Sequence, residues 1–208
     1  MNSEHFFLQA VSPKIAEEIY NRYMVADFPP AERKPLAMIL QGMQAGNYEF
    51  LGLYAADQTL AGYAVLVTGR EQAAALLDYY AVLPQNRCGG VGKTGLALLR
   101  QHYAGRLDNI LIESEYPAEA PDPALADRRL GFYARAGCRK TSIAERLFGV
   151  RYTIFSLDCS APGAKRPSHQ LEEELRRLYA GMIPEPAFSL HVQFGEKAVA
   201  FQEPQSWD

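Results

Sequence analysis

The chain has 208 residues, of which 48% are hydrophobic and 22% are charged, values typical of a globular protein and not of a disordered or fibrous one. Its 21 Lys and Arg residues against 24 Asp and Glu residues give a formal net charge of −3. This balance argues against a general nucleic-acid binder, because such binding depends on basic side chains that neutralise phosphates. No apolar segment approaches the roughly 20 residues that span a bilayer, and residues 1–5 show no secretory signal. The three cysteines and four histidines lack ligand spacing, so we expect a cytoplasmic protein with no membrane partner and no metal.

The first half of the chain predicts two helices followed by a run of strands. Ser12 followed by Pro13 is typical of a helix start, and Gly46 of a helix end. Polar turns separate runs that are rich in Leu, Val and aromatic residues, which indicates strands. The expected order is a strand at 5–8, a helix at 13–24, a helix at 36–45, a hairpin of strands 48–55 and 60–67, and a buried strand at 74–83.

The second half predicts a parallel crossover and then a small extension. A glycine-rich loop at 87–92 leads into a helix that ends near Gly105, and strand 109–115 follows, so this strand should lie parallel to the one before the loop. A helix at 123–136 and strands at 138–148 and 151–157 complete a domain of residues 1–160. We expect residues 161–208 to form a short helix and a strand at 188–194, packed on the domain or on a partner subunit.

The glycine-rich loop allows two interpretations that carry chemistry. The segment from Cys88 to Thr94 ends in Gly-Lys-Thr like a nucleotide-binding P-loop, but Arg87 stands where that motif requires its first glycine. The later strand that would supply a magnesium-binding aspartate runs into Glu113 instead. An NTPase is therefore disfavoured. A tight turn whose glycines serve only the connection is the plain alternative.

Two segments resemble the GNAT acyltransferase superfamily. Val82-x-Pro84-x-x-Arg87-x-x-Gly90-x-Gly92 resembles its acetyl-CoA signature, and the segment Arg128 to Gly137 resembles a family helix that ends in Phe-Tyr-x-x-x-Gly. The resemblance implies an α/β (α+β) GNAT fold, with a mixed central sheet of about six to seven strands flanked by helices and a C-terminal helix and strand extension. It also implies that acetyl-CoA is bound by Tyr80, Ala81, Val82, Arg87, Cys88, Gly89, Gly90, Val91, Gly92, Lys93, Thr94 and Tyr133. Ala126 departs from the pattern, because many members have an asparagine there that contacts CoA.

The resemblance places two catalytic candidates. Tyr133 matches the family's general acid, which protonates the departing thiolate, although a tyrosine that only packs on the sheet would look the same in sequence. Glu113 is a carboxylate within an apolar strand and is our candidate for the base that takes the acceptor's proton. Its structural alternative is an ion pair, for example with Arg128. Glu115 and Asp78 remain alternative bases, and a nucleophilic role for Cys88 is disfavoured because no histidine lies near it.

Taken together, these features predict an acetyl-CoA-dependent N-acetyltransferase that acts on a primary amine. The sequence leaves open whether the acceptor is a small molecule or a peptide N-terminus or lysine. It also leaves open whether the protein forms a homodimer. The resemblance also implies that the segments 28–33 and 148–150 line the acceptor side, where Glu32 either attracts a cationic amine or is a solvated glutamate at a helix start. The alternative is a catalytically silent acyl-CoA-binding module.

Overall fold

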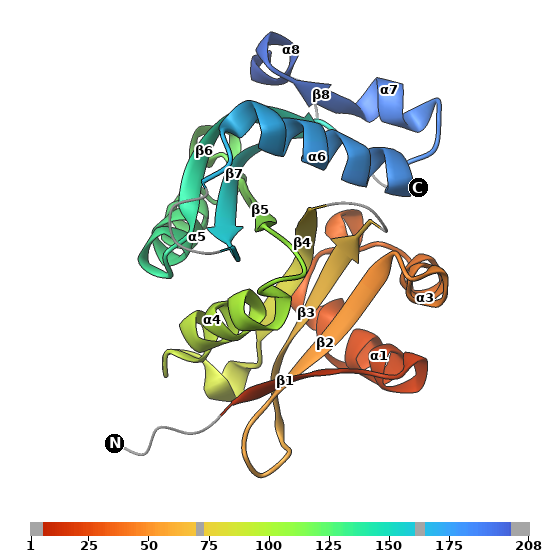
Figure 1. The fold of residues 1–208 in the computed structure, drawn as a ribbon, viewed down its shortest axis with the longest axis vertical. Coiled ribbons are helices and arrows are strands. Elements are labelled where there is room, and N and C mark those ends of the chain that lie inside the picture. Colours follow the sequence, from red (N-terminus) through yellow and green to blue (C-terminus); the bar gives the residue numbers. More distant parts are fainter. Residues whose placement is uncertain (1–5, 70–72, 161–164, 201–208) are drawn as a thin grey trace.

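The computed structural model describes residues 6–69, 73–160 and 165–200, and within them one eight-stranded sheet organises the chain. The strand order is β1-β2-β3-β4-β5-β7-β6-β8 (Figure 1). The strands are β1 (Phe7–Ala10), β2 (Tyr48–Tyr54), β3 (Leu60–Thr68), β4 (Ala74–Val82), β5 (Asn109–Glu115), β6 (Arg139–Leu147), β7 (Val150–Asp158) and β8 (Val192–Phe194). All neighbours are antiparallel except β4 and β5, which are parallel as the crossover predicts. The predicted fold class is confirmed, with more strands than the six to seven expected.

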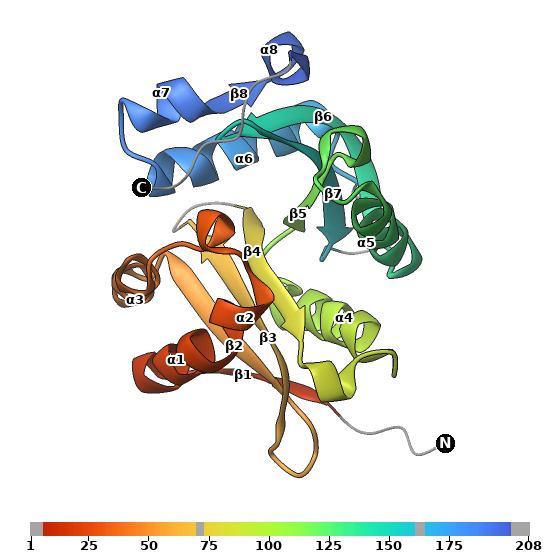
Figure 2. The ribbon, with the colours of Figure 1, turned by 180° about the vertical axis from the view of Figure 1, so that it is seen from behind.

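Helices cover both faces of this sheet (Figures 1 and 2). One hydrophobic core lies under α1 (Pro13–Ile19), α3 (Leu36–Ala45) and α6 (Ser168–Met182), and a second under α4 (Val91–Tyr103) and α5 (Pro123–Arg135). Each helix turns an apolar stripe to the sheet, as Leu96, Leu99 and Tyr103 do from α4. The shorter elements are η1 (Tyr20–Met24), α2 (Val25–Asp27), η2 (Pro30–Glu32), η3 (Pro84–Asn86), η4 (Pro117–Glu119), α7 (Ala187–His191) and α8 (Glu196–Val199).

The helix signals in the sequence correspond to observed caps. The Ser12 side chain accepts a hydrogen bond from the Ile15 amide at 3.3 Å, and Asp122 accepts one from the Leu125 amide at 2.9 Å. Gly46 ends α3 in the left-handed conformation at φ 76°. The first helix continues past its predicted end at Met24, because the π-helical turn η1 passes directly into α2.

β4 and β5 separate part-way along their length, and this divergence creates the site described below. Their pairing runs only from Ala74 opposite Asn109 to Leu77 opposite Ile112. A register shift against β3 falls at the same place, since Leu77 and Tyr79 pair with consecutive β3 residues and Asp78 between them has no partner there. Beyond Leu77, the β4 backbone therefore has no β5 strand beside it.

The C-terminal segment belongs to the same sheet and core. Leu171, Leu175 and Leu178 of α6 are buried, and β8 pairs antiparallel with β6. The predicted strand at 188–194 is wrong over most of its length, because 187–191 form the helix α7 and only 192–194 are extended. The alternating apolar pattern there is outweighed by a local helix start, in which both the amide and the hydroxyl of Ser189 donate to the Glu185 carboxylate. A domain boundary at residue 160 stays a prediction.

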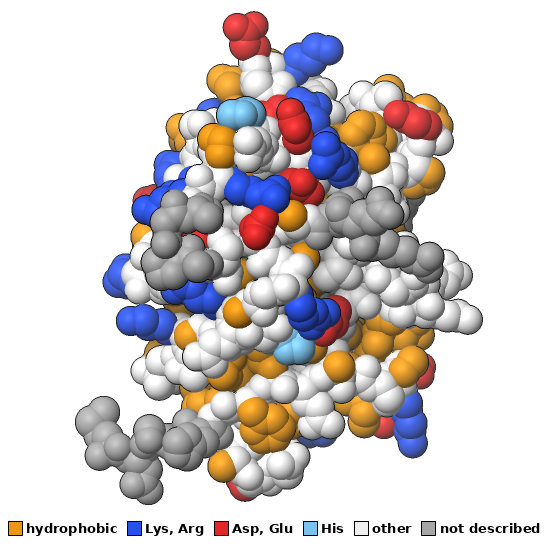
Figure 3. Space-filling model, viewed as in Figure 1, with side chains coloured by type: hydrophobic (Ala, Val, Ile, Leu, Met, Phe, Trp, Pro, Cys, Tyr) orange, Lys and Arg blue, Asp and Glu red, His pale blue; other side chains and the backbone are white. Residues whose placement is uncertain are grey.

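The surface carries charges of both signs. On the face shown in Figure 3, Lys and Arg side chains alternate with Asp and Glu side chains over the upper half of the molecule. Among the described residues, no helix combines the length and the hydrophobicity needed to cross a membrane.

Candidate functional site

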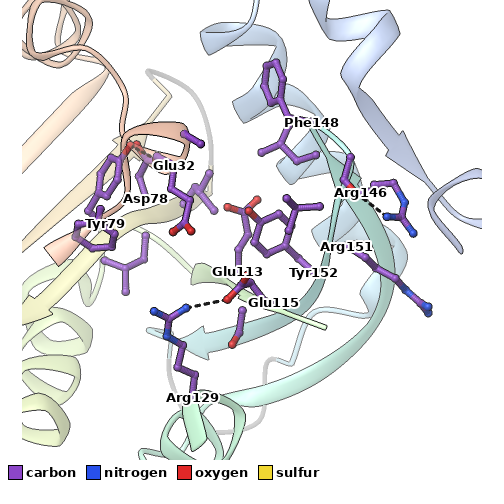
Figure 4. Close-up of a pocket in the computed structure, with 18 of the residues that line it drawn as sticks. Glu32, Asp78, Tyr79, Glu113, Glu115, Arg129, Arg146, Phe148, Arg151 and Tyr152 are labelled. Carbon is purple, nitrogen blue, oxygen red and sulfur yellow. Dashed lines mark hydrogen bonds and ion pairs between the residues drawn. The ribbon is translucent and has the colours of Figure 1, made fainter. Parts of the chain in front are cut away.

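A cavity of about 540 Å³ opens where β4 and β5 separate (Figure 4). Its walls come from segments far apart in the sequence: η2, the ends of β4 and β5, helix α5, the turn between β6 and β7, and α6. The side chains that line it combine aromatic rings with both acidic and basic groups. They include Phe28, Glu32, Lys34, Asp78, Tyr79, Tyr80, Glu113, Glu115, Glu119, Arg129, Tyr133, Arg146, Phe148, Arg151, Tyr152 and Tyr179.

Glu113 occupies the point of divergence on β5, directly after the last residue paired with β4. Part of its side chain faces the cavity, but its Oε1 atom is buried and has no hydrogen-bond partner. Burial raises the pKa of Glu113 to about 8, and the neighbouring charge of Asp78 acts in the same direction while that of Lys34 opposes it. A carboxyl with such a pKa is well placed to take up and release protons near neutral pH.

The two alternative bases lie in the same cavity but are engaged in ion pairs. Asp78 accepts a hydrogen bond at Oδ1 from the Lys34 ammonium, and both side chains are nearly inaccessible to solvent. Glu115 accepts one at Oε2 from Arg129 at 3.0 Å. The ion pair between α5 and β5 thus joins Arg129 to Glu115. The alternative considered from the sequence, an ion pair of Arg128 with Glu113, is not observed among the described residues.

Tyr133 reaches the same cavity from α5. Its ring packs against Phe132 and Phe155, with centroid distances of 5.2 and 5.7 Å. Burial raises the pKa of the Tyr133 hydroxyl to about 12, with the positive charge of Arg129 opposing the shift. The hydroxyl therefore keeps its proton at neutral pH, as a general acid requires.

The charges around the cavity leave two carboxylates without a cation. Arg146 and Arg151 both bind Glu119, at 2.8 and 3.1 Å, just as Lys34 binds Asp78 and Arg129 binds Glu115. Among the described residues, no ion pair reaches Glu32 or Glu113. Glu32 lies at the cavity rim, and partial burial raises its pKa, an effect to which the charge of Glu115 adds. A positively charged acceptor would find these two groups available.

A second buried acid stands behind the cavity wall. Glu145 on β6 is fully buried, and its Oε1 atom accepts a hydrogen bond from the Tyr179 hydroxyl of α6 at 2.8 Å. Burial raises the pKa of Glu145 well above its usual range, and the charge of Glu113 adds to this effect. Tyr152, whose pKa is raised by burial and then by the nearby Glu113 and Glu145, lies among these carboxyls.

The glycine-rich loop lies outside this cavity, at the start of α4. Gly90 begins the helix with φ 82°, a conformation that strains any residue with a side chain, and α4 has no side-chain cap. Its first amides are therefore available to an anion such as a diphosphate. Gly92 packs closely against α5, because a Cβ atom there would lie 3.1 Å from the Phe132 ring. Cys88 is exposed, and no described side chain forms a hydrogen bond with it.

Two of the other predicted cofactor-binding residues, Arg87 and Tyr80, have side chains that form hydrogen bonds within the protein. Arg87 is tied to Asp27 Oδ1 at 2.9 Å and to the Val82 carbonyl at 2.9 Å, so it fixes the loop against β4 and α2. The Tyr80 hydroxyl donates to the Gly92 carbonyl at 2.6 Å and joins β4 to α4. Ala126, the departure from the family pattern, is completely buried and offers no contact to a ligand.

The sequence interpretation missed Lys34, Glu145, Tyr152 and Tyr179. Glu145 had a usable signal, since it follows apolar residues within a predicted strand just as Glu113 does. Lys34 had none, because it lies in a loop and meets Asp78 across 44 residues of sequence. In the described part of the chain, no group of three or more His, Cys, Asp or Glu side chains is arranged to hold a metal ion.

Comparisons with known proteins identify the fold. No protein-family model and no curated protein matches the chain. Among solved structures, an acetyltransferase described as from the GNAT family of Bacteroides thetaiotaomicron aligns with a TM-score of 0.68 and 18% identity, over 85% of this chain and 97% of that one. Spermidine N-acetyltransferase from Vibrio cholerae, in complex with CoA and spermine, aligns with a TM-score of 0.57 and 11% identity, over 76% and 96%. A GNAT-family protein from Desulfovibrio desulfuricans aligns with a TM-score of 0.54 and 21% identity, over 76% and 99%. The chain has the GNAT fold, which confirms the fold that the sequence resemblance implies.

Proposed function

We propose that this protein transfers the acetyl group of acetyl-CoA to the primary amine of a small, positively charged acceptor. The observation that carries the proposal is the meeting of Glu113 and Tyr133 in one cavity, at the point where β4 and β5 diverge. One group has a pKa suited to accepting a proton near neutral pH, and the other holds a proton that it can donate. The names of the structural neighbours point the same way.

The donor side of this proposal rests on unpaired backbone groups. Beyond Leu77, β4 has no β5 strand beside it, so the backbone groups of Tyr80, Ala81 and Val82 that point away from β3 could pair with an extended amide-bearing chain such as pantetheine, except for the Val82 carbonyl that Arg87 already binds. The amides at the start of α4 after Gly90 would hold the diphosphate. Amides directed at the thioester carbonyl would also stabilise the charge that develops on its oxygen.

The chemistry follows from the two side chains. Glu113 takes a proton from the acceptor's ammonium group, directly or through water, because only the neutral nitrogen can attack the carbonyl carbon. A C–N bond then forms, the C–S bond breaks, and Tyr133 gives its proton to the departing sulfur. Of the two protons that the ammonium loses, one leaves to solvent by way of Glu113 and the other restores Tyr133.

The acceptor side is supported by charge and by shape. Glu32 and Glu113 lack ion-pair partners among the described residues, while the rings of Phe28, Phe148 and Tyr152 would pack against an apolar body. A small amine that carries positive charge fits this lining. One structural neighbour is named for its action on spermidine, and polyamines are therefore the first acceptors to test.

Thiol release from acetyl-CoA with a library of amines tests the proposal. We expect E113Q to lower kcat/KM by about 100- to 10,000-fold and Y133F by a smaller factor, since general acid–base groups contribute in this range. With Glu113 as the base, kcat/KM of the unchanged protein should rise with pH and level off above about 8.

An exposed glutamate of α6 supplies the matched control, and E173Q should leave kcat/KM unchanged. If E113Q and Y133F both retain the original kcat/KM across the pH range, the two assignments are wrong. Stabilisation by acetyl-CoA with no thiol release from any amine would indicate the silent binding module instead.

A further inference from the structure

Lys34 is buried in an unusual way for a lysine in a loop. Its side chain is 2% exposed although it lies between η2 and α3, and lysine is almost never fully buried unless its charge is paired. The ammonium group donates to Asp78 Oδ1 and lies 4.0 Å from Met182 Sδ of α6. The rings of Tyr48 and Tyr79 are also close to it, with centroids at 6.0 and 5.8 Å.

The loop around Lys34 is held in place by tyrosine hydroxyls. The Lys34 amide donates to the Tyr79 hydroxyl at 2.8 Å, and that hydroxyl donates to the Glu32 carbonyl at 3.0 Å. The Tyr20 hydroxyl donates to the Lys34 carbonyl at 2.9 Å. Three backbone groups of the loop, two on Lys34 and one on Glu32, are thus hydrogen-bonded to two tyrosine side chains, which holds the Lys34 backbone in place.

That place is the point where the sheet divides. Asp78 is the first β4 residue beyond the paired segment, and Glu113 is the first on β5, so the two carboxyls face the same gap. Each has one buried oxygen without a hydrogen-bond partner, Oδ2 of Asp78 and Oε1 of Glu113. Two carboxylates in such a site repel each other, and Lys34 brings a positive charge to them.

We propose that Lys34 is a positioning residue for acetyl transfer, which through its ion pair with Asp78 neutralises the gap between β4 and β5 and keeps Glu113 free to serve as the base. This inference rests on the proposed function, since it concerns the same proton transfer. Lys34 acts through its neighbours and does not touch the reacting atoms.

The surroundings of Glu113 leave this task to Lys34. The charged and titratable side chains that act on Glu113 or share its cavity come from every surrounding element: Glu32, Lys34, Asp78, Tyr79, Tyr80, Glu115, Glu119, Arg129, Tyr133, Glu145, Arg146, Arg151, Tyr152 and Tyr179. Arg129 is paired with Glu115, Arg146 and Arg151 are paired with Glu119, and only Lys34 of these cations acts on the pKa of Glu113. Lys34 is therefore the cation whose loss would change the proton affinity of Glu113 most.

The test compares the pH dependence of kcat/KM in variants of Lys34 and Asp78, which should shift in opposite directions. With K34M, Asp78 and Glu113 lose the shared cation, so the rise of kcat/KM should move to higher pH by at least about one unit, and the rate at pH 7 should fall about tenfold or more. With D78N, Glu113 loses the repelling carboxylate and keeps the cation, so the rise should move to lower pH. The double variant K34M/D78N should lie near the original profile, and K34R should retain it.

A structural role would give a different pattern. Variants that only loosen the cavity would lower kcat/KM at every pH without moving the profile, and shifts of the same sign from K34M and D78N would equally overturn the inference. Lys14 is exposed on α1, and K14M is the matched control that should leave the profile unchanged.

A measurement without turnover separates this inference from the proposed function. Carbon-13 NMR of labelled glutamate carboxyls can follow the titration of Glu113, with its signal assigned by its loss in E113Q. The same opposite shifts are expected there, even if no amine is ever acetylated. Shifts in this titration without acetyl transfer would reject the proposed function alone, whereas unchanged titration in K34M would reject the role of Lys34. Far-UV circular dichroism confirms that each variant is folded.

Discussion

Two buried carboxyls flank the same cavity and are stabilised by different kinds of partner. Asp78 receives the ammonium group of Lys34 from a loop of the N-terminal half, and Glu145 receives the hydroxyl of Tyr179 from the C-terminal helix α6. In each case one carboxyl oxygen is bonded and the other is buried without a hydrogen-bond partner. The geometry is similar, and the difference is the charge of the donor.

This difference determines the charge state of each pair. A phenol brings no positive charge, so burial dominates at Glu145 and raises its pKa well above the usual range, which favours the neutral acid. The ammonium group makes the other site an ion pair. Glu113 lies between them, and of these two flanking pairs only that of Lys34 and Asp78 carries charges that can tune it.

Removing the cation is expected to have the largest effect on stability. K34M leaves Asp78 as a buried charge without its partner, and we expect the free energy of unfolding at pH 7 to fall by about 3–5 kcal/mol. Urea denaturation followed by far-UV circular dichroism measures this loss. The double variant K34M/D78N removes both charges and should recover much of it, so equal losses in the two variants would show that the ion pair is not the cause.

The sequence predicted the parts of the site whose signal is local. The glycine loop and each element of the β-α-β crossover are encoded by consecutive residues, and Glu113 stands out as a carboxylate in an apolar strand. The pairing of Lys34 with Asp78 could not be predicted in this way, because it depends on how far β4 and β5 diverge and on where the tyrosine hydroxyls hold the loop.

In the C-terminal segment, by contrast, a local sequence pattern predicted the wrong secondary structure. Residues 188–194 alternate between apolar and polar side chains as a strand does, yet Ser189 bonds to the carboxylate of Glu185 and the first residues form the helix α7. Periodicity alone could not reveal that α6 would bring Tyr179 to Glu145, since that contact spans 34 residues.

Loss of the phenol should have an intermediate effect. Y179F keeps the ring but leaves Glu145 with neither oxygen hydrogen-bonded, and we expect the free energy of unfolding to fall by about 1–3 kcal/mol, the usual penalty for an unsatisfied buried group. The same denaturation experiment measures it. Tyr54 is partly exposed at the end of β2, so Y54F should change stability by less than about 0.5 kcal/mol. A loss as large as that of K34M would mean that Glu145 is charged.

The smallest effect is expected from E145Q, which replaces a neutral acid by a neutral amide of the same shape. At pH 6 the free energy of unfolding should change by less than about 1 kcal/mol, because Tyr179 can still donate to the amide oxygen.

The difference in stability between E145Q and the unchanged protein should depend on pH. A carboxyl whose pKa is raised in the folded protein contributes stability that is complete below its unfolded value near 4.5 and is lost as pH rises through the folded value. The unchanged protein should therefore lose up to about 1.4 kcal/mol per pH unit more than E145Q as pH rises above 5 towards the folded value of Glu145. As the matched control, E196Q on the exposed start of α8 should follow the unchanged protein. Parallel stability curves for E145Q and the unchanged protein would show that Glu145 is ionised when folded, and the contrast with Asp78 would then fail.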